Sequence, residues 1–114
     1  MTLSRELYME MYLKMQRIRE FDMRINKLVR RGFVQGMTHF SVGEEAASVG
    51  AIAHLSYDDI IFSNHRGHGQ SIAKDMDLNK MMAELAGKAT GVSKGRGGSM
   101  HLADFEKGNY GTNG

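Results

Sequence analysis

Apolar residues recur every three or four positions in the first part of the chain. They are Leu7, Met11, Met15, Ile18, Phe21, Ile25 and Leu28. This spacing places them on one face of an α-helix, so the pattern predicts a long amphipathic helix from Ser4 to Arg31. Arg30 and Arg31 supply cations at its end, and Gly32 suits a left-handed cap. The polar face mixes both signs of charge, which favours packing within the subunit over a membrane surface.

Small side chains dominate the next helical segment. Ser41 and Glu44 have the spacing of a capping box, in which each side chain accepts a hydrogen bond from a free backbone N–H at a helix start. We therefore predict a helix with its body from Glu45 to Leu55. It is built from Ala46, Ala47, Ser48, Gly50, Ala51 and Ala53. Such side chains allow close approach of neighbouring backbones, so we expect this helix to be buried at an interface.

A short run from Asp59 to Ser63 is rich in β-branched and aromatic residues, which is typical of a buried strand of a parallel sheet. The pattern offers no partner strand. Helical spacing returns at Gln70–Lys74 and at Asp77–Ala86, where Gly87 ends the second helix. The apolar stripe of that helix consists of Leu78, Met81, Met82 and Leu85.

The segment from Gly87 to Gly114, called here the glycine-rich segment, contains eight of the fourteen glycines. It predicts a long loop, and loops of this length are usually functional or disordered. The expected fold is therefore a mostly α arrangement of about four helices, one short parallel-sheet strand and a Gly-rich C-terminal loop. A strand without a partner and a tail without an anchor indicate one domain over residues 1–114 that is part of a larger α/β fold.

Composition narrows the classes of function. A hydrophobic fraction of 41% and a charged fraction of 25% are those of a globular protein. A formal net charge of +2 is too small to indicate a polyanionic partner by itself. Cysteine is absent, which excludes thiolate nucleophiles and zinc–cysteine sites. No stretch resembles a signal-peptide core or a membrane span, so a cytoplasmic location is the default expectation.

The segment Asn64–Gly69 lies where the predicted strand gives way to a helix, the edge at which open α/β sheets bind ligands. Imidazoles that titrate near neutral pH, a guanidinium that can grip a phosphate and backbone amides next to glycine suit an anionic cofactor. The alternatives are a solvated surface turn, or a metal site formed by His39, His65 and His68. No carboxylate motif of the hydrolase type accompanies these histidines.

A second candidate is Lys94–His101, which combines cations, glycines, a hydroxyl and an imidazole. It could cradle a phosphate or form a flexible basic loop, although it is neither a Walker loop nor a dinucleotide fingerprint. An RNA-binding tail is the rival interpretation, but the aromatic residues that such a tail would stack on bases are nearly absent. His39 precedes a predicted helix start, where anions bind, whereas His54 is best explained as polar filler.

Five motifs occur here in an order that resembles the alpha subunits of thiamine-diphosphate-dependent dehydrogenases, over about Leu13 to Gly114. The motifs are Gly36–His39, Gly43–Ala46, Asn64–Gly69, Met82–Leu85 and Lys94–His101. The His-Arg-Gly-His-Gly form is most similar to acetoin dehydrogenase, since pyruvate dehydrogenase relatives more often carry Tyr in place of His65. The resemblance implies an N-terminal part of the α/β thiamine-diphosphate-binding fold.

The resemblance also implies roles for individual residues. Arg66 would contact the cofactor diphosphate, and His65 would lie beside it. His39 and His68 would line the channel as catalytic proton donors or acceptors. The cofactor-binding set is completed by Ser99 and His101, whose individual roles stay open. The magnesium ion that accompanies thiamine diphosphate would take its ligands from a later Gly-Asp-Gly motif and Asn, so no metal ligand is expected within this chain.

The implied activity is cleavage of acetoin, or decarboxylation of a 2-oxo acid such as pyruvate, with transfer of the two-carbon unit to a lipoyl group. The implied partners are a beta subunit, a lipoyl-bearing acyltransferase and a small-molecule substrate, in an oligomer without nucleic acid or membrane. This chain alone would be inactive. The alternative is a non-catalytic interaction or oligomerisation module derived from the same family, which would be indifferent to the cofactor.

Overall fold

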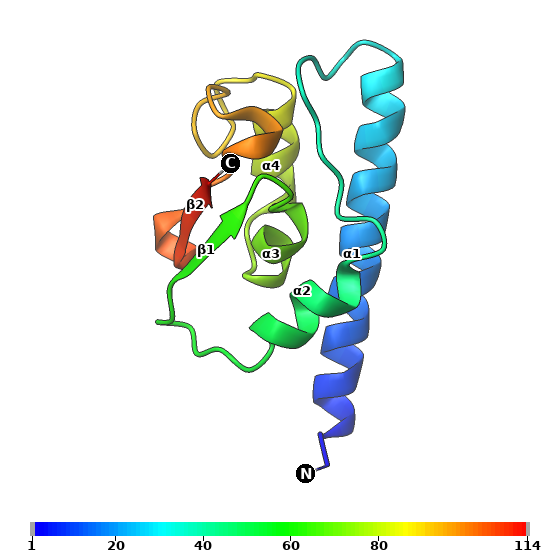
Figure 1. Cartoon of the computed structure of the whole chain (residues 1–114), viewed down its shortest axis with the longest axis vertical. Coiled ribbons are helices and arrows are strands. Elements are labelled where there is room, and N and C mark those ends of the chain that lie inside the picture. The colour runs from blue at the N-terminus through cyan, green and yellow to red at the C-terminus, as the bar shows by residue number, and fades with distance from the viewer. Residues whose placement is uncertain (1, 114) are drawn as a thin grey trace.

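The computed structural model describes residues 2–113, in which a small parallel sheet lies at one side of the helices (Figure 1). The helices are α1 (Arg5–Arg30), α2 (Glu45–Ile52), α3 (His68–Ala73) and α4 (Leu78–Leu85), and the strands are β1 (Ile61–Asn64) and β2 (Asn109–Asn113). Two short 3-10 turns, Gly98–Met100 and Phe105–Lys107, interrupt the glycine-rich segment. The mostly helical architecture with four helices is as predicted.

The long first helix confirms the periodicity argument. Ser4 caps α1 by accepting a hydrogen bond from the backbone N–H of Leu7 at 3.1 Å, and Gly32 leaves the helix with φ +80°. The left-handed φ explains glycine there, because other residues adopt it at a cost. Helix α4 is capped in the same way by Asp77, whose carboxylate accepts from Lys80 N at 2.9 Å. Both helix starts thus use side chains of the types that favour the N-cap position.

The start of α2 differs from the prediction. Ser41 does not cap α2, because its hydroxyl donates to the carbonyl of Arg66 at 3.1 Å and accepts from Gly69 N–H at 3.1 Å. The capping-box prediction was therefore wrong, since tertiary contacts with the β1–α3 region claim the hydroxyl. Glu45, instead of Glu44, reaches back to the backbone N–H of Gly43 at 2.9 Å.

Helix α2 is also shorter and more exposed than expected. It ends at Ile52 instead of Leu55, and only Glu45, Ser48 and Val49 are buried. Its alanines at 46, 47 and 51 are exposed, so the predicted burial holds for one face only within this chain. On that face α2 and α3 approach closely, because a Cβ at Gly69 would lie 2.7 Å from the Ser48 hydroxyl.

The predicted strand has a partner. β1 pairs in parallel with β2, with Ile61 opposite Asn109 and Asn64 opposite Asn113. The expectation of an unpaired strand was wrong, because β2 reads Asn-Tyr-Gly-Thr-Asn and lacks the apolar alternation that marks strands. The strand was also expected to be buried, yet the Phe62 side chain is 67% exposed. This face of the sheet is therefore open within the described residues.

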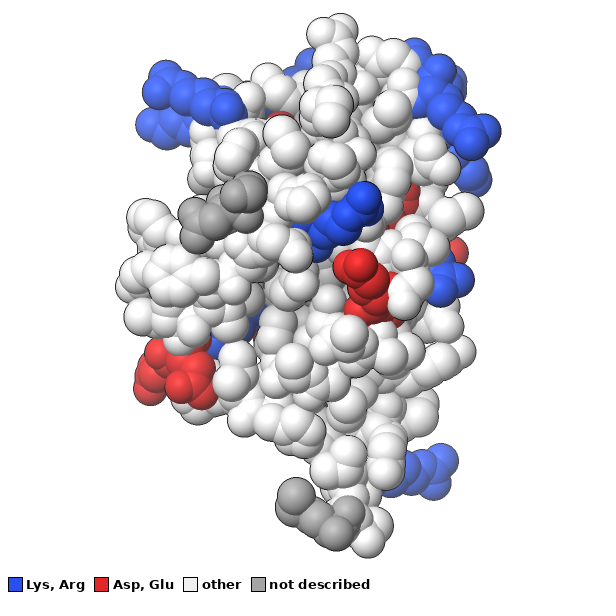
Figure 2. All heavy atoms as spheres, in the orientation of Figure 1, with Lys and Arg blue, Asp and Glu red and all other residues white. Residues whose placement is uncertain are grey.

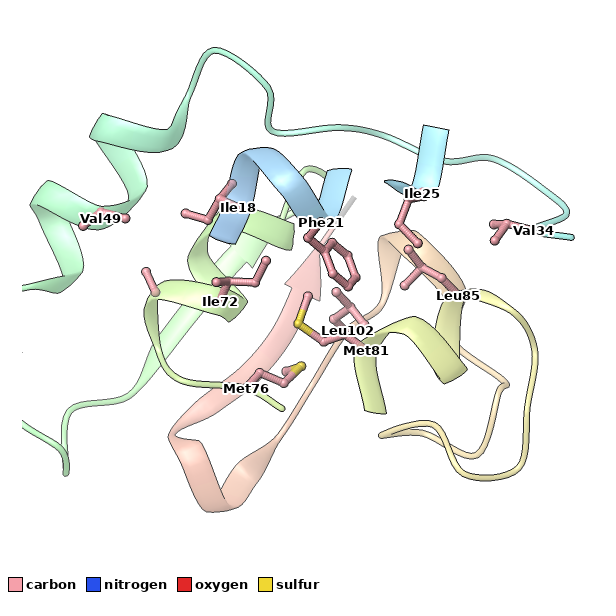
Figure 3. Close-up of a cluster of buried hydrophobic side chains, with 11 residues drawn as sticks. Ile18, Phe21, Ile25, Val34, Val49, Ile72, Met76, Met81, Leu85 and Leu102 are labelled. Carbon is pink, nitrogen blue, oxygen red and sulfur yellow. The ribbon is translucent and has the colours of Figure 1, made fainter. Parts of the chain in front are cut away.

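The core lies between α1, α3, α4 and the glycine-rich segment (Figure 3). Its largest fully buried apolar side chains are Ile18, Ile25, Met81, Leu102 and Val49. Ile18, Phe21 and Ile25 come from the predicted stripe of α1, and Met81 and Leu85 come from that of α4. Leu102 anchors the glycine-rich segment in this core, which explains why the segment is folded instead of loose.

Charge is sparse on the face seen in Figure 2, where Lys and Arg gather mainly at the upper edges and no continuous cationic patch crosses the view. Large apolar side chains reach the surface instead. The most exposed of them are Tyr57, Phe105, Met37, Phe62 and Phe33. Phe62, Tyr110 and Phe105 form a ladder of ring contacts along the sheet, with centroids 5.9 and 5.1 Å apart. The surface therefore gives no support to a polyanion-binding role on this side.

Candidate functional site

The loop that joins β1 to α3 carries an exposed cation at the carboxyl end of a parallel strand. The backbone N–H of Arg66 donates to Asn64 Oδ1 at 2.9 Å, which shapes the turn after β1. The Arg66 Nη1 donates to the carbonyl of Phe40 at 3.0 Å. One guanidinium edge is thus fixed against the segment before α2, and the exposed side chain leaves further N–H donors for a ligand.

Two predicted histidines meet beside this cation. The rings of His39 and His65 form an edge-to-face pair with centroids 4.8 Å apart. Burial holds the pKa of His39 below its usual value, and the positive potential of His65 and Arg66 lowers it further. A neutral imidazole at His39 can accept a proton over a wider pH range than an unperturbed histidine. Both side chains are partly exposed, so a ligand can reach them.

His68 lies beneath these residues and is fully buried. Its Nδ1 lies 2.7 Å from Asp22 Oδ1, and its Nε2 lies 2.8 Å from the Ser99 hydroxyl. The Ser99 hydroxyl also accepts a hydrogen bond from the backbone N–H of His39 at 3.2 Å. The structure therefore joins His68 to the site through Ser99. The resemblance led us to expect its imidazole on the surface that a ligand can reach, but the imidazole is buried.

The glycine-rich segment is organised around one buried carboxylate. Oε2 of Glu84 accepts backbone N–H groups from Ser93 and Gly95, both at 2.8 Å. Oε1 accepts from Gly97 at 2.7 Å and from Gly98 at 3.2 Å. Burial raises the pKa of Glu84, but the four N–H groups outweigh it and the net shift is downward. The segment before Ser99 thus wraps a carboxylate that belongs to the protein itself.

His101 is the one predicted site residue that lies apart. It is exposed at the end of the Gly98–Met100 turn, and within residues 2–113 no hydrogen bond or ring contact joins it to the other histidines. The His101 backbone explains why position 97 is glycine, since a Cβ there would lie 2.7 Å from the His101 carbonyl oxygen. The structure therefore groups five of the six predicted residues and leaves His101 at the margin.

An open cavity of about 610 Å³ separates the glycine-rich segment from the segment that follows α1. Gly36 and Met37 line one side, and Arg96, Gly98 and Ser99 line the other. The cavity is predominantly polar, and Lys88 is among its lining residues. Ser99 is the predicted site residue that lines it, whereas His39, His65 and Arg66 are not among its lining residues.

The donor set fits an anionic ligand. An exposed guanidinium, two imidazoles and a backbone turn after a parallel strand are the groups that hold phosphates at such edges. The Thr38 Oγ1, next to His39, is buried without a hydrogen-bond partner among the described residues, so a polar group here is free to bind a ligand atom. Residues 2–113 bring together no three side chains suited to a metal ion.

Three of the residues that build the site were missed by sequence reasoning. Asp22, Ser41 and Glu84 are all fully buried. A signal for two of them existed, since Asp22 and Glu84 are acidic residues at stripe positions of otherwise apolar helix faces, and buried carboxylates need partners. The partners themselves lie far away in the sequence, so only the fold identifies them. Within the described residues no helix combines the length and apolarity needed to cross a bilayer.

Comparison with known proteins gives consistent matches. Residues 13–114 match the family described as dehydrogenase E1 component. The alpha subunit of acetoin:2,6-dichlorophenolindophenol oxidoreductase from Bacillus subtilis is 51% identical over 114 residues, which are 100% of this chain and 34% of that protein. The Cupriavidus necator protein of the same name is 47% identical over 112 residues, 98% of this chain and 34% of the relative.

A third relative carries a different name. The pyruvate dehydrogenase E1 component subunit alpha of Zymomonas mobilis is 40% identical over 112 residues, which are 97% of this chain and 32% of the relative. The chain thus spans about one third of the length of these relatives. The described site lies inside the matched region.

Proposed function

Because the chain belongs to the dehydrogenase E1 component family, we propose that it forms part of the alpha subunit of a thiamine-diphosphate-dependent oxidoreductase. The reaction is cleavage of acetoin, or decarboxylation of a 2-oxo acid such as pyruvate, with transfer of the two-carbon unit to a lipoyl group. The relatives named for acetoin, at 51% and 47% identity, favour acetoin over pyruvate, where the identity is 40%.

The observation that carries the proposal is the position of Arg66. Its guanidinium is exposed at the carboxyl end of β1 and is braced by the Phe40 carbonyl. A planar cation fixed along one edge can offer its remaining N–H groups to two phosphate oxygens at once. We assign Arg66 to the cofactor diphosphate and His65 to the same ligand beside it.

The other residues would handle protons and shape the pocket. His39 is partly exposed, and its lowered pKa keeps the imidazole near neutral pH in the neutral form, which is the form that accepts a proton. Ser99 lines the cavity and fixes the His39 backbone. His101 would reach the ligand only at the margin of the site. His68 would support His39 indirectly, through its hydrogen bond with the Ser99 hydroxyl.

When bound, thiamine diphosphate supplies the stabilisation of negative charge that lets the carbon–carbon bond break. We propose that its magnesium ion takes ligands from outside these residues, and that a beta subunit completes the site. A lipoyl-bearing acyltransferase is the proposed acceptor of the two-carbon unit. This division leaves binding, orientation and proton transfer to the residues described here.

The test is a comparison of substrates with the complete protein and its partner subunit. Acetoin and pyruvate are each supplied with thiamine diphosphate, Mg²⁺ and 2,6-dichlorophenolindophenol, and dye reduction is followed. Acetoin should give the faster cofactor-dependent reduction. A faster reaction with pyruvate would reverse the substrate assignment, and no reduction with either would favour the non-catalytic interaction module.

A further inference from the structure

A buried carboxylate on α1 connects the parts of the site from behind. Asp22 is fully buried, and both of its oxygens are occupied. Oδ1 lies 2.7 Å from His68 Nδ1, and Oδ2 accepts the backbone N–H of Ser41 at 2.5 Å. The residues Asp22, Ser41, His68 and Ser99 are called here the Asp22 network.

The first arm of the network runs to His39. A carboxylate next to Nδ1 favours the tautomer of His68 that carries its proton on Nδ1. The Nε2 is then an acceptor, so the Ser99 hydroxyl donates to it across 2.8 Å. The same hydroxyl oxygen accepts from the backbone N–H of His39 at 3.2 Å. Every polar atom along this arm is satisfied when the Asp22 carboxylate is charged.

The second arm runs to Arg66. Asp22 fixes the Ser41 backbone, and the Ser41 hydroxyl donates to the Arg66 carbonyl at 3.1 Å. The neighbouring Phe40 carbonyl accepts from Arg66 Nη1 at 3.0 Å. This arm therefore holds both the backbone and the guanidinium of Arg66. The two arms share only Asp22 and the short segment that contains His39, Phe40 and Ser41.

We propose that Asp22 is a positioning residue that holds His39 and Arg66 in register through these two arms. The inference rests on the proposed function, since it concerns the placement of a proton acceptor and a diphosphate ligand. His68 serves as an internal link with a fixed tautomer and does not meet the substrate. Its burial and its two hydrogen bonds inside the network carry this assignment.

An Asp, a His and a Ser in sequence also occur in hydrolases that use the hydroxyl as a nucleophile. Here Ser99 is 5% exposed, and its hydroxyl is engaged by both His68 and the His39 backbone. The geometry thus assigns Ser99 to support instead of attack. Labelling of Ser99 by a fluorophosphonate probe would overturn this part of the inference.

The main variant is Asp22→Asn, which keeps the shape and removes the charge. Its amide can accept at one position only, so the NH₂ group must face either the Ser41 N–H or His68 Nδ1. An NH₂ group that faces the Ser41 N–H breaks the arm that runs to Arg66. An NH₂ group that faces His68 Nδ1 forces the other tautomer on His68 and so disrupts the arm that runs to His39. Asp77→Asn is the matched control, because Asp77 caps α4 at an exposed position and Asn caps equally well.

Two variants cut one arm each and leave the carboxylate in place. Ser99→Ala should lower kcat by about tenfold or more through a displaced His39, with the Kd for thiamine diphosphate nearly unchanged. Ser41→Ala should weaken thiamine diphosphate binding by about three- to tenfold, the value of one hydrogen bond, with a smaller effect on kcat. Asp22→Asn should show both defects together.

The experiment uses the complete protein with its partner subunit, with thiamine diphosphate binding followed by calorimetry in Mg²⁺ and kcat measured on acetoin. The split between kcat and Kd among the variants separates positioning from a general loss of stability, which would lower both in every variant. If Asp22→Asn fails to fold, the two serine variants still decide the question. The inference would be overturned if the wild type binds thiamine diphosphate and both serine variants have the kcat and Kd of the wild type. Failure of the wild type to bind thiamine diphosphate would overturn the proposed function itself.

Discussion

Replacing Glu84 with glutamine removes the charge around which the glycine-rich segment folds. The carboxylate accepts four backbone N–H groups at 2.7–3.2 Å, two on each oxygen. A glutamine side chain has nearly the same shape but one acceptor oxygen. Its NH₂ group must therefore face two N–H donors that have no other partner in this arrangement.

The cost follows from this geometry. Leaving a buried donor unsatisfied costs about 1–3 kcal/mol, so two such groups cost about 2–6 kcal/mol. The segment is anchored elsewhere by Leu102, which is fully buried, so we expect the cost to appear as local opening of the segment. A free-energy change of this size corresponds to amide exchange that is faster by about 30-fold or more.

Hydrogen exchange measured by mass spectrometry tests this expectation in the assembled protein. Glu84→Gln should accelerate exchange in peptides that cover residues 93–98 and leave peptides of α1 unchanged. Glu20→Gln is the matched control, because Glu20 is exposed on α1 and makes only a long contact of 3.8 Å with Arg24. Equal exchange in wild type and Glu84→Gln, or acceleration spread evenly over all peptides, would refute the reasoning.

Further predictions concern stability. The pKa values of Glu84 and Glu45 are lowered in the folded state, so both carboxylates stabilise the fold above their ordinary pKa of about 4.3. This contribution is lost as the pH falls through the folded pKa values. In an acid titration followed by circular dichroism, Glu84→Gln should therefore lose less stability than the wild type between neutral and acidic pH. Met81→Ala, in the core, should lower the free energy of unfolding by about 2–5 kcal/mol in urea denaturation. Gly91→Ala should destabilise by about 1–3 kcal/mol in the same assay, because its Cβ would lie 2.6 Å from Glu84 Cα, whereas Gly50→Ala, where nothing lies within 4 Å, should be neutral or stabilising. An equal response of the two glycine variants would contradict the packing argument.

The helices were predictable because their signals are local. The α1 stripe recurs regularly through seven apolar residues from Leu7 to Leu28, and Ser4 and Asp77 cap their helices with their own side chains. Ser41 has the same local signature but makes its bonds to Arg66 and Gly69 instead. A capping motif therefore predicts a helix start only where no distant group competes for the hydroxyl.

The sequence predicted several residues of the site but not which of them are buried and which are accessible. The motif after β1 identified the turn that carries His65 and Arg66 and the start of α3 at His68. Nothing local distinguishes the partly exposed imidazole of His65 from the buried imidazole of His68, since the difference is created by α1, which packs against His68. Asp22 is separated from His68 by 46 positions, so their hydrogen bond follows from the fold alone. Strand β2 was not predicted for a similar reason. Its sequence lacks the apolar alternation of a strand, and its pairing with β1 is a contact between segments that are distant in the sequence.

The central claim is that Arg66 binds the diphosphate of thiamine diphosphate, and calorimetry on the assembled protein tests it most directly. The wild type and Arg66→Gln are titrated with thiamine diphosphate in Mg²⁺, with Arg96→Gln as a control for loss of one cation from the neighbouring glycine-rich segment. We predict saturable binding in the wild type, binding weakened by about tenfold or more in Arg66→Gln, and a smaller change in Arg96→Gln. Equal affinity of the wild type and Arg66→Gln, or no binding by the wild type, would contradict the account.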